Sequence, residues 1–219
     1  DVLPPKKRER INVTVADELV ELCKEGRRKL NQINARGVTQ ERNKAFQELV
    51  QATAKGKVDA AIPFLREFLT DPRRCNKKII LFAYHHVVLD ALEDMCIALF
   101  GRNSYIRIDG TTPGGQRLNL CNRFQRSSST KIAILSITAA GVGINLCKAT
   151  VVIFVELYWN PGTVLQAEDR AHRIGQNETV MVYYIIGKGT LDGAMWGTIR
   201  RKAAVVGEAI DGANRNVLR

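Results

Sequence analysis

The pattern of apolar and polar residues changes at about residue 75. Before this point charged residues dominate, and apolar positions recur at helical spacing. After it, short apolar runs alternate with amphipathic stretches. The apolar runs predict buried strands over residues 78–83, 105–108, 131–137, 150–157 and 180–186.

The stretches between these runs have the periodicity of helices. They predict helices over residues 86–100, 113–126, 163–173 and 190–206. Gly101 is suited to end the first of them, and Pro113 to open the second. Strands that alternate with helices pair in parallel through right-handed crossovers. We therefore expect an α/β fold, with a parallel sheet covered by helices on both faces.

The first 75 residues are expected to form a helical extension. One short strand is indicated by alternating apolar residues, Ile11, Val13 and Val15. Asp17 then caps a helix that Gly37 interrupts. Two further helices are predicted over 39–54 and 57–70, with Pro63 in the first turns of the second, where proline is best tolerated.

Composition and charge narrow the class of partner. Hydrophobic residues make up 45% of the 219 positions, which is enough for a packed core. Lys plus Arg is 33 against 22 for Asp plus Glu, and the net charge of +11 favours a polyanionic partner, either nucleic acid or a membrane surface. A basic protein with no such partner stays open on charge alone. No run of 18 apolar residues is present, so we expect no transmembrane helix and no membrane partner.

Cysteine usage and the N-terminus bear on the compartment. The five cysteines form no C-x-x-C pair and are odd in number, as expected for reduced, mostly buried thiols of a cytosolic or nuclear protein. The first ten residues are basic but are followed by no apolar signal core. The cluster KKRER at 6–10 is either a nuclear address or a solvated segment.

Polar residues follow each of the first four strands predicted after residue 75. They are Tyr84-His85, Asp109-Gly110-Thr111-Thr112, the stretch from Thr138 to Asn145, and Tyr158-Trp159-Asn160-Pro161. The carboxyl ends of parallel strands meet at one edge, where such sheets bind ligands. Glycines, hydroxyls and amides suit contacts with phosphate groups. Ordinary turn chemistry explains any one of these loops equally well.

A second candidate lies in the sequence QAEDRAHRIGQ at 166–176. On the predicted helix, spacings of four and three place Gln166, Arg170 and Arg173 on one face. Arginine carries a planar donor fork that suits phosphate oxygens, as in arginine fingers. The alternative is a set of exposed ion pairs with Glu168 and Asp169.

Other chemistries lack their motifs. No Cys or His spacing resembles a zinc site, and we expect no metal ligands in this chain. No G-x-x-x-x-G-K-[ST] sequence is present, although Gly187-Lys188-Gly189-Thr190 resembles its end. A nucleotide motor needs that loop to hold the β- and γ-phosphates with Mg²⁺. We therefore expect this chain alone to be unable to hydrolyse ATP.

Several stretches in order resemble the Swi/Snf family of superfamily-two helicase-like ATPases. They are KKIILFAYHHVVLDALE, YIRIDGTT, IAILSITAAGVGIN, VVIFVELYWNPG, QAEDRAHRIGQ and YYIIGKGTLDGAMWGTIRRKA. The resemblance is strong over 76–206 and is nearest to the annealing-helicase branch, with its zinc-finger Ran-binding-type and HepA-related members. It implies the second of two RecA-like lobes at 76–189, an inter-lobe insertion at 1–75, and a brace helix with a tail at 190–219.

The resemblance also implies roles for individual residues. Arg170 and Arg173 would be arginine fingers, with Gln166 beside them, and Gly143 and Asn145 would lie in the motif that touches nucleotide and couples it to DNA. The residues expected to face the DNA backbone are Tyr84, His85, Gly110, Thr111 and Thr138. ATP would bind between the lobes, with the Mg²⁺ ligands on the first lobe.

The implied function is that of a nuclear, ATP-dependent translocase on double-stranded or branched DNA that remodels replication forks in DNA repair, together with replication or repair factors. Its partner within the same protein would be the first lobe. Ala140-Gly141 stands where many remodellers have Gly-Gly, and Glu156-Leu157-Tyr158 where many have an acidic-polar-acidic stretch. These departures favour the annealing branch. A chromatin-remodelling lobe and a catalytically silent DNA-binding lobe are the alternatives.

Overall fold

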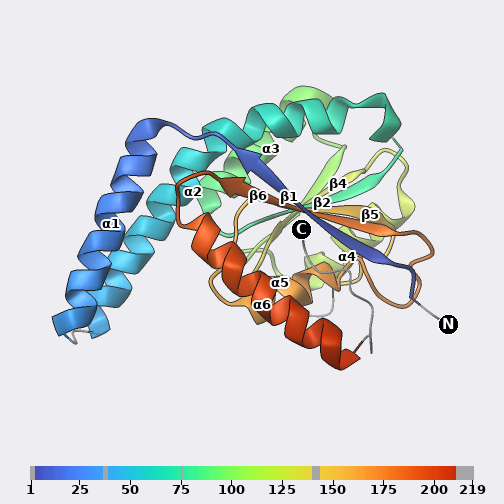
Figure 1. Cartoon of the computed structure of the whole chain (residues 1–219). Helices are drawn as coiled ribbons and strands as arrows, with labels where there is room; N and C mark the ends of the chain where they lie inside the picture. Colours follow the sequence, from blue (N-terminus) through green and yellow to red (C-terminus); the bar gives the residue numbers. More distant parts are fainter. Residues whose placement is uncertain (1–2, 37–38, 75, 140–143, 211–219) are drawn as a thin grey trace.

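A six-stranded, fully parallel sheet forms the centre of the computed structural model (Figure 1), which describes residues 3–36, 39–74, 76–139 and 144–210. The strands lie in the order β1-β6-β5-β2-β4-β3. Their bounds are β1 (Lys6–Val13), β2 (Lys78–Ala83), β3 (Tyr105–Ile108), β4 (Ile132–Ser136), β5 (Ala149–Phe154) and β6 (Val180–Gly187). The expected parallel α/β fold is confirmed, and the strands predicted after residue 75 all form.

Helices cover both faces of the sheet. They are α1 (Asp17–Arg36), α2 (Thr39–Thr70), α3 (His86–Phe100), α4 (Gly114–Arg126), α5 (Pro161–Glu168) and α6 (Asp192–Ile210), with a short 3₁₀ helix at Pro72–Arg74. The first three pack on one face and the last three on the other. Figure 1 shows α1 beside the first part of α2, where the two project away from the sheet.

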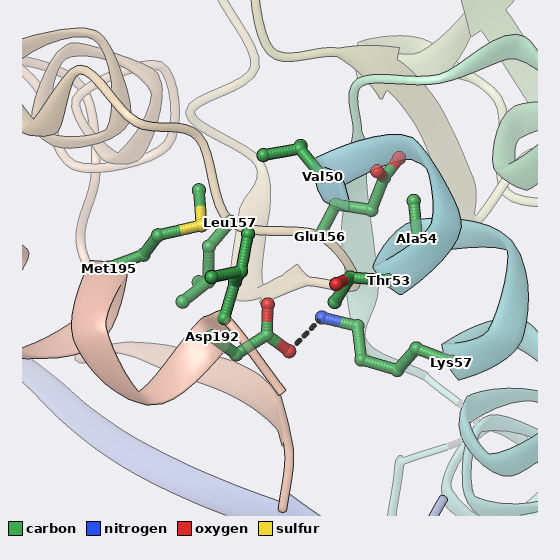
Figure 2. A pocket seen from close by; sticks show the side chains of 9 residues that line it. Val50, Thr53, Ala54, Lys57, Glu156, Leu157, Asp192 and Met195 are labelled. Carbon is green, nitrogen blue, oxygen red and sulfur yellow. Dashed lines mark hydrogen bonds and ion pairs between the residues drawn. The ribbon is translucent and has the colours of Figure 1, made fainter. Parts of the chain in front are cut away.

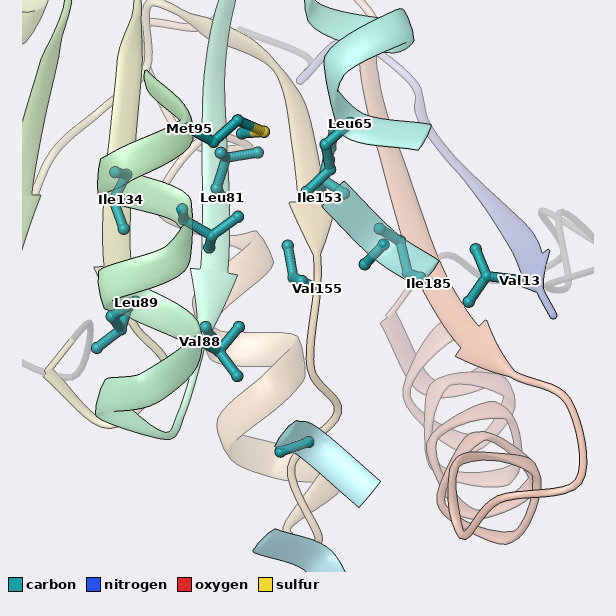
Figure 3. Packing of buried hydrophobic residues seen from close by; sticks show 14 of the residues in the cluster. Val13, Leu65, Leu81, Val88, Leu89, Met95, Ile134, Ile153, Val155 and Ile185 are labelled. Atoms are coloured by element: carbon teal, nitrogen blue, oxygen red, sulfur yellow. The ribbon is translucent and has the colours of Figure 1, made fainter. Parts of the chain in front are cut away.

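Alternation along the buried strands divides the core into two layers. In β2, Leu81 belongs to the cluster under α1, α2 and α3, whereas Ile80 and Phe82 belong to the cluster under α4, α5 and α6. Successive side chains of a strand point to opposite faces, so a strand buried on both sides must be apolar throughout. Figure 3 shows the first cluster, with Leu81, Ile134 and Ile153 facing helix residues such as Leu65 and Leu89.

The edge strand β1 belongs to the same sheet. It pairs in parallel with β6, in a register that runs from Lys6 opposite Val180 to Val13 opposite Gly187. The strand that the alternation around Ile11 predicted is therefore confirmed, and it begins further upstream.

The prediction of two separate helices before residue 71 is wrong, because α2 is continuous over Thr39–Thr70. Gly56, whose position falls between the two predicted ranges, serves close packing of α1 on α2. A Cβ at Gly56 would lie 2.7 Å from a methyl of Leu19, and a Cβ at Gly26 would lie 2.6 Å from a methyl of Leu49. Pro63 is consequently inside the helix and not in its first turns, where it removes one backbone hydrogen bond.

A buried ion pair joins α2 to α6. Lys57 Nζ lies 2.6 Å from Asp192 Oδ2 and 3.1 Å from the carbonyl of Ile185, and the Lys57 side chain is only 2% exposed. The same carboxylate oxygen accepts a hydrogen bond from Gly187 N at 2.9 Å. Figure 2 shows the pair beside a cavity of about 10 Å³, room for about one water, that Thr53 and Glu156 also line. These contacts hold the start of α6 against the middle of α2.

Replacing Lys57 should destabilise the fold strongly. Lys57→Met leaves the Asp192 carboxylate buried without its cation, and we expect the free energy of unfolding to fall by about 3 kcal/mol in urea denaturation. Lys55→Met is the matched control, because Lys55 is exposed two residues away on the same helix. Equal unfolding midpoints for the two variants would contradict this assignment.

Candidate functional site

The five residues predicted to contact a nucleic-acid backbone follow three neighbouring strands. Tyr84 and His85 come after β2, Gly110 and Thr111 after β3, and Thr138 after β4. Because β2, β4 and β3 are adjacent in the sheet, these loops lie at one edge. Gly110, Thr111 and Thr138 are exposed, whereas Tyr84 and His85 are half-buried.

Backbone contacts hold the loops after β2 and β4 together. Ile137 N donates to the carbonyl of Ala83 at 2.9 Å, so Thr138 follows directly beside the Tyr84-His85 turn. The Thr138 hydroxyl lies 3.1 Å from the hydroxyl of Ser136. The polar groups predicted from separate loops therefore share one surface.

The carboxylate of Glu156 organises the turn after β2. Its Oε2 accepts from the backbone N–H groups of Tyr84 at 2.7 Å and His85 at 2.9 Å, and its Oε1 lies 2.7 Å from His85 Nδ1. The residue is 3% exposed, and a carboxylate buried to this degree is stable only with such partners. Glu156 thus fixes both the backbone and the ring of His85.

Aromatic rings gather beside this turn. The Tyr84 ring centroid lies 4.9 Å from that of Tyr158 and 5.1 Å from that of Trp159, and the last two rings are 4.0 Å apart. Trp159 stays 38% exposed. Burial, with a smaller contribution from Tyr84, raises the pKa of Tyr158, so its hydroxyl stays neutral at physiological pH.

Asp109 holds the loop after β3. Its Oδ1 accepts from Thr111 N at 2.9 Å and from the Thr111 hydroxyl at 2.6 Å, while Arg107 Nε donates to Oδ2 at 3.0 Å. Burial acts to raise the pKa of Asp109, but these hydrogen bonds and the Arg107 charge outweigh it and lower the pKa to about 2. Arg117 closes the loop by donating to the carbonyl of Thr112 at 3.0 Å.

Asp109→Asn should destabilise the chain in a pH-dependent way. The folded-state pKa is depressed, so the carboxylate stabilises the fold above the unfolded-state pKa of about 4, by roughly 2 kcal/mol. This contribution is lost as the pH falls from about 4 toward the folded value of about 2. Urea denaturation of wild type and variant across this pH range should show the difference shrinking.

Asp94→Asn is the control for this measurement, because Asp94 is exposed on α3. A difference between wild type and Asp109→Asn that stays constant down to pH 2 would contradict the assignment of this stability to the carboxylate.

Residues 169–175, which include Arg170 and Arg173, form turns and bends and not a helix. We call this segment the arginine turn. Helix α5 begins at Pro161, behind the cap of Asn160, and ends at Glu168, so the predicted helix over 163–173 is wrong at both ends. Gln166 is exposed on the helix, whereas Arg170 and Arg173 are half-buried in the turns that follow. The predicted common helical face of these three residues therefore does not exist.

Hydrogen bonds redirect the chain at this point. The N–H of Arg170 donates to the carbonyl of Ala167 at 3.2 Å, three residues back instead of four. The carbonyl of Arg170 accepts from Leu146 N at 3.1 Å, and a helix that continued through 173 would use this carbonyl internally. Gln176 then donates through Nε2 to the carbonyls of Cys147 and Ala149, both at 2.8 Å.

The same contacts bring the segment of Asn145 beside the arginine turn. Asn145 is exposed, and its Oδ1 accepts from Cys147 N at 3.2 Å. Its chain neighbour Leu146 is the residue that bonds Arg170. Gly143, the other residue predicted for this motif, lies outside the described residues.

The acidic neighbours of the arginines pair with cations on β1. Glu168 is 0% exposed, and its carboxylate lies 2.7 Å from Arg8 Nη2 and 2.8 Å from Lys6 Nζ. Asp169 lies 3.0 Å from Lys6 Nζ, and the Tyr184 hydroxyl donates to Glu168. Burial acts to raise the pKa of Glu168, but Lys6 and Arg8 outweigh it and hold the pKa below its usual range.

Sequence reasoning missed the roles of Glu156, Asp109 and Glu168. A signal existed for Glu156, because a carboxylate at the end of a long apolar run is buried and requires donors nearby. For Glu168, no local signal identifies partners 160 residues upstream.

Two further predictions concern features outside this site, namely the absence of metal ligands and of a transmembrane helix. In the described part of the chain, no three or more His, Cys, Asp or Glu side chains gather as a metal ion would require. Among the same residues, no helix combines the length and apolarity needed to cross a bilayer. The placement of Mg²⁺ ligands on another lobe stays a prediction.

The arrangement is a parallel α/β lobe with polar loops at one edge of its sheet. The sequence model described as "Helicase conserved C-terminal domain" matches residues 60–175, and the chain belongs to this family.

Curated relatives agree with the resemblance to the annealing-helicase branch of the Swi/Snf family. The chain is 40% identical over 214 residues to the Bos taurus protein named "DNA annealing helicase and endonuclease ZRANB3", which covers 96% of this chain and 19% of that protein. It is 42% identical over 158 residues to the Xenopus tropicalis "SWI/SNF-related matrix-associated actin-dependent regulator of chromatin subfamily A-like protein 1", covering 72% of this chain and 16% of that protein. The chain thus spans about a fifth of these relatives.

Two solved structures have the same fold. The C-terminal part of the Fun30 ATPase domain matches with a TM-score of 0.69 and 21% identity, over 90% of this chain and 89% of that one. The Sulfolobus solfataricus SWI2/SNF2 ATPase core in complex with dsDNA matches with a TM-score of 0.70 and 23% identity, over 96% of this chain and 47% of that one.

Proposed function

We propose that this chain is the second motor lobe of an ATP-dependent annealing helicase that translocates on double-stranded DNA. The whole protein would remodel replication forks and act in DNA repair in the nucleus, with a first lobe that holds the nucleotide and Mg²⁺. The 40% identity to a protein named as a DNA annealing helicase supports this function.

The observation that carries the proposal is the bond between Leu146 N and the carbonyl of Arg170. It joins two polar segments that lie far apart in the sequence, one with Asn145 and one with Arg170 and Arg173. Arginine forks and an exposed amide are donors that fit the oxygens of a triphosphate. Gln166 lies on the helix that leads into this turn.

In this proposal Arg170 and Arg173 stabilise the charge that develops on the γ-phosphate during hydrolysis. ATP supplies the phosphoryl group, and the first lobe supplies the P-loop that this chain lacks. Gly143 and Asn145 couple the nucleotide to DNA. This chain without the first lobe therefore has no ATPase activity, and arginine-dependent turnover by the isolated chain would refute the assignment.

The polar loops at the sheet edge form the DNA contact. Tyr84, His85, Gly110, Thr111 and Thr138 follow adjacent strands, and Glu156 and Asp109 hold their loops in place. Contacts to phosphates do not read bases, so binding is indifferent to sequence. The net charge of +11 adds a favourable, salt-sensitive attraction.

Arg170→Ala in the full-length protein should abolish DNA-stimulated ATP hydrolysis while DNA affinity is unchanged. An arginine finger contributes about 10³-fold or more to turnover, and its removal leaves the DNA surface intact. Turnover with saturating DNA and fluorescence anisotropy with labelled duplex measure the two effects. Arg66→Ala, at an exposed position of α2, is the control. Loss of DNA binding in Arg170→Ala would make this residue a DNA contact instead.

Thr138→Glu in the full-length protein should weaken binding to duplex DNA by about tenfold, because a carboxylate would face the phosphates. Ser128→Glu is the matched control, since Ser128 is exposed before β4, at the opposite end of the same strand. Equal affinities of the two variants in a titration at moderate salt would argue against the sheet edge as the DNA surface.

A further inference from the structure

The arginine turn is fastened to the N-terminal strand by a buried ionic cluster. Glu168, the last residue of α5, is 0% exposed and lies two positions before Arg170. Arg8 approaches it as a fork, with Nε at 2.8 and 3.0 Å from the two carboxylate oxygens and Nη2 at 2.7 Å from the second. Lys6 adds a second cation at 2.8 Å. Both cations come from β1.

Two further contacts join the same turn to the start of the chain. His172 Nε2 lies 2.7 Å from the carbonyl of Pro4, and Asp169 lies 3.0 Å from Lys6 Nζ. Residues on both sides of Arg170 are therefore held by the segment from Pro4 to Arg8. The opposite side of the turn is held by the Leu146 bond to the Arg170 carbonyl.

Strand pairing does not by itself require this cluster. The backbone ladder with β6 extends over all eight residues of β1. A buried ion pair is often no more stabilising than apolar residues of similar volume, whereas its bidentate geometry sets the position of both partners. The Arg8–Glu168 fork therefore specifies where α5 ends and in which direction the turn leaves it.

We propose that Arg8 and Glu168 are positioning residues for ATP hydrolysis, which act by holding the turn that carries Arg170 and Arg173. The inference rests on the proposed function of these two arginines. An arginine that stabilises a transition state must be held to within a fraction of an ångström, and a displacement of about 1 Å can reduce the rate about 100-fold. The ionic cluster supplies this constraint from β1.

The test uses the full-length protein and a matched pair of variants. Arg8→Gln breaks the fork, and Arg10→Gln makes the same chemical change at an exposed position of the same strand. For Arg8→Gln we expect a fall in kcat of DNA-stimulated hydrolysis by about 10- to 100-fold, with less than about twofold change in the KM for ATP and in DNA affinity. Arg10→Gln should match wild type.

Conservative variants separate positioning from loss of folding. Arg8→Lys keeps the buried charge without the fork, and Glu168→Gln keeps the shape without the charge. Both should show intermediate kcat values with an unchanged KM for ATP. If Arg8→Gln fails to fold, these two variants take its place. Parallel losses of thermal stability, DNA affinity and turnover in all three variants would show a merely structural role and overturn the proposal.

A double variant tests whether Arg8 acts through the arginine turn. In an Arg173→Lys background, Arg8→Gln should lower kcat by a smaller factor than in wild type, because both changes weaken the same interaction. Equal factors in both backgrounds would overturn the proposal. Wild-type turnover in Arg170→Ala would overturn the proposed function itself. Normal turnover in Arg8→Gln, together with loss of turnover in Arg170→Ala, would overturn only the inference about Arg8.

Discussion

The placement of the arginine turn depends on one buried charge, the carboxylate of Glu168. A carboxylate without exposed surface loses its hydration, which costs several kcal/mol unless cations and donors replace the water. Lys6 and Arg8 supply the cations and the Tyr184 hydroxyl supplies a further donor, so strands β1 and β6 and the end of α5 must meet at one point. The helix therefore ends where this meeting requires, although its sequence would allow it to continue.

Buried carboxylates play a similar part at the carboxyl edge of the sheet. Glu156 accepts from two successive backbone N–H groups after β2, and Asp109 accepts from the backbone and hydroxyl of Thr111 after β3. Each therefore converts a flexible connection into a loop of defined shape on a rigid scaffold, the usual location of functional residues. The exposed residues of these loops and the groups that hold them in place are chemically different, because the holding groups are buried carboxylates.

The fold could be predicted from the sequence further than the site could. Apolar runs such as the one within 78–83 identify strands buried on both faces, because few other structures accept five successive apolar residues between polar stretches. Two separate helices were predicted over 39–54 and 57–70, since local propensity carries no information about Leu19 packing onto α2. The spacing of Arg170 and Arg173 suggested a helical face for the same reason. The shared edge of the polar loops followed from the parallel pairing of the strands. The pairing of Arg8 with Glu168 depends on tertiary structure that no local pattern encodes.

The continuity of α2 has a mechanical consequence. At 1.5 Å per residue, its 32 residues form a rod of about 48 Å, whose first part projects with α1 beyond the sheet. The ion pair of Lys57 with Asp192 fastens this rod near its middle, next to the start of α6. The projecting part of α2 and the part packed on the sheet therefore lie on opposite sides of this ion pair. A load on the projecting part of α1 and α2 would therefore act on the sheet through the Lys57–Asp192 pair as well as through the packed end of α2.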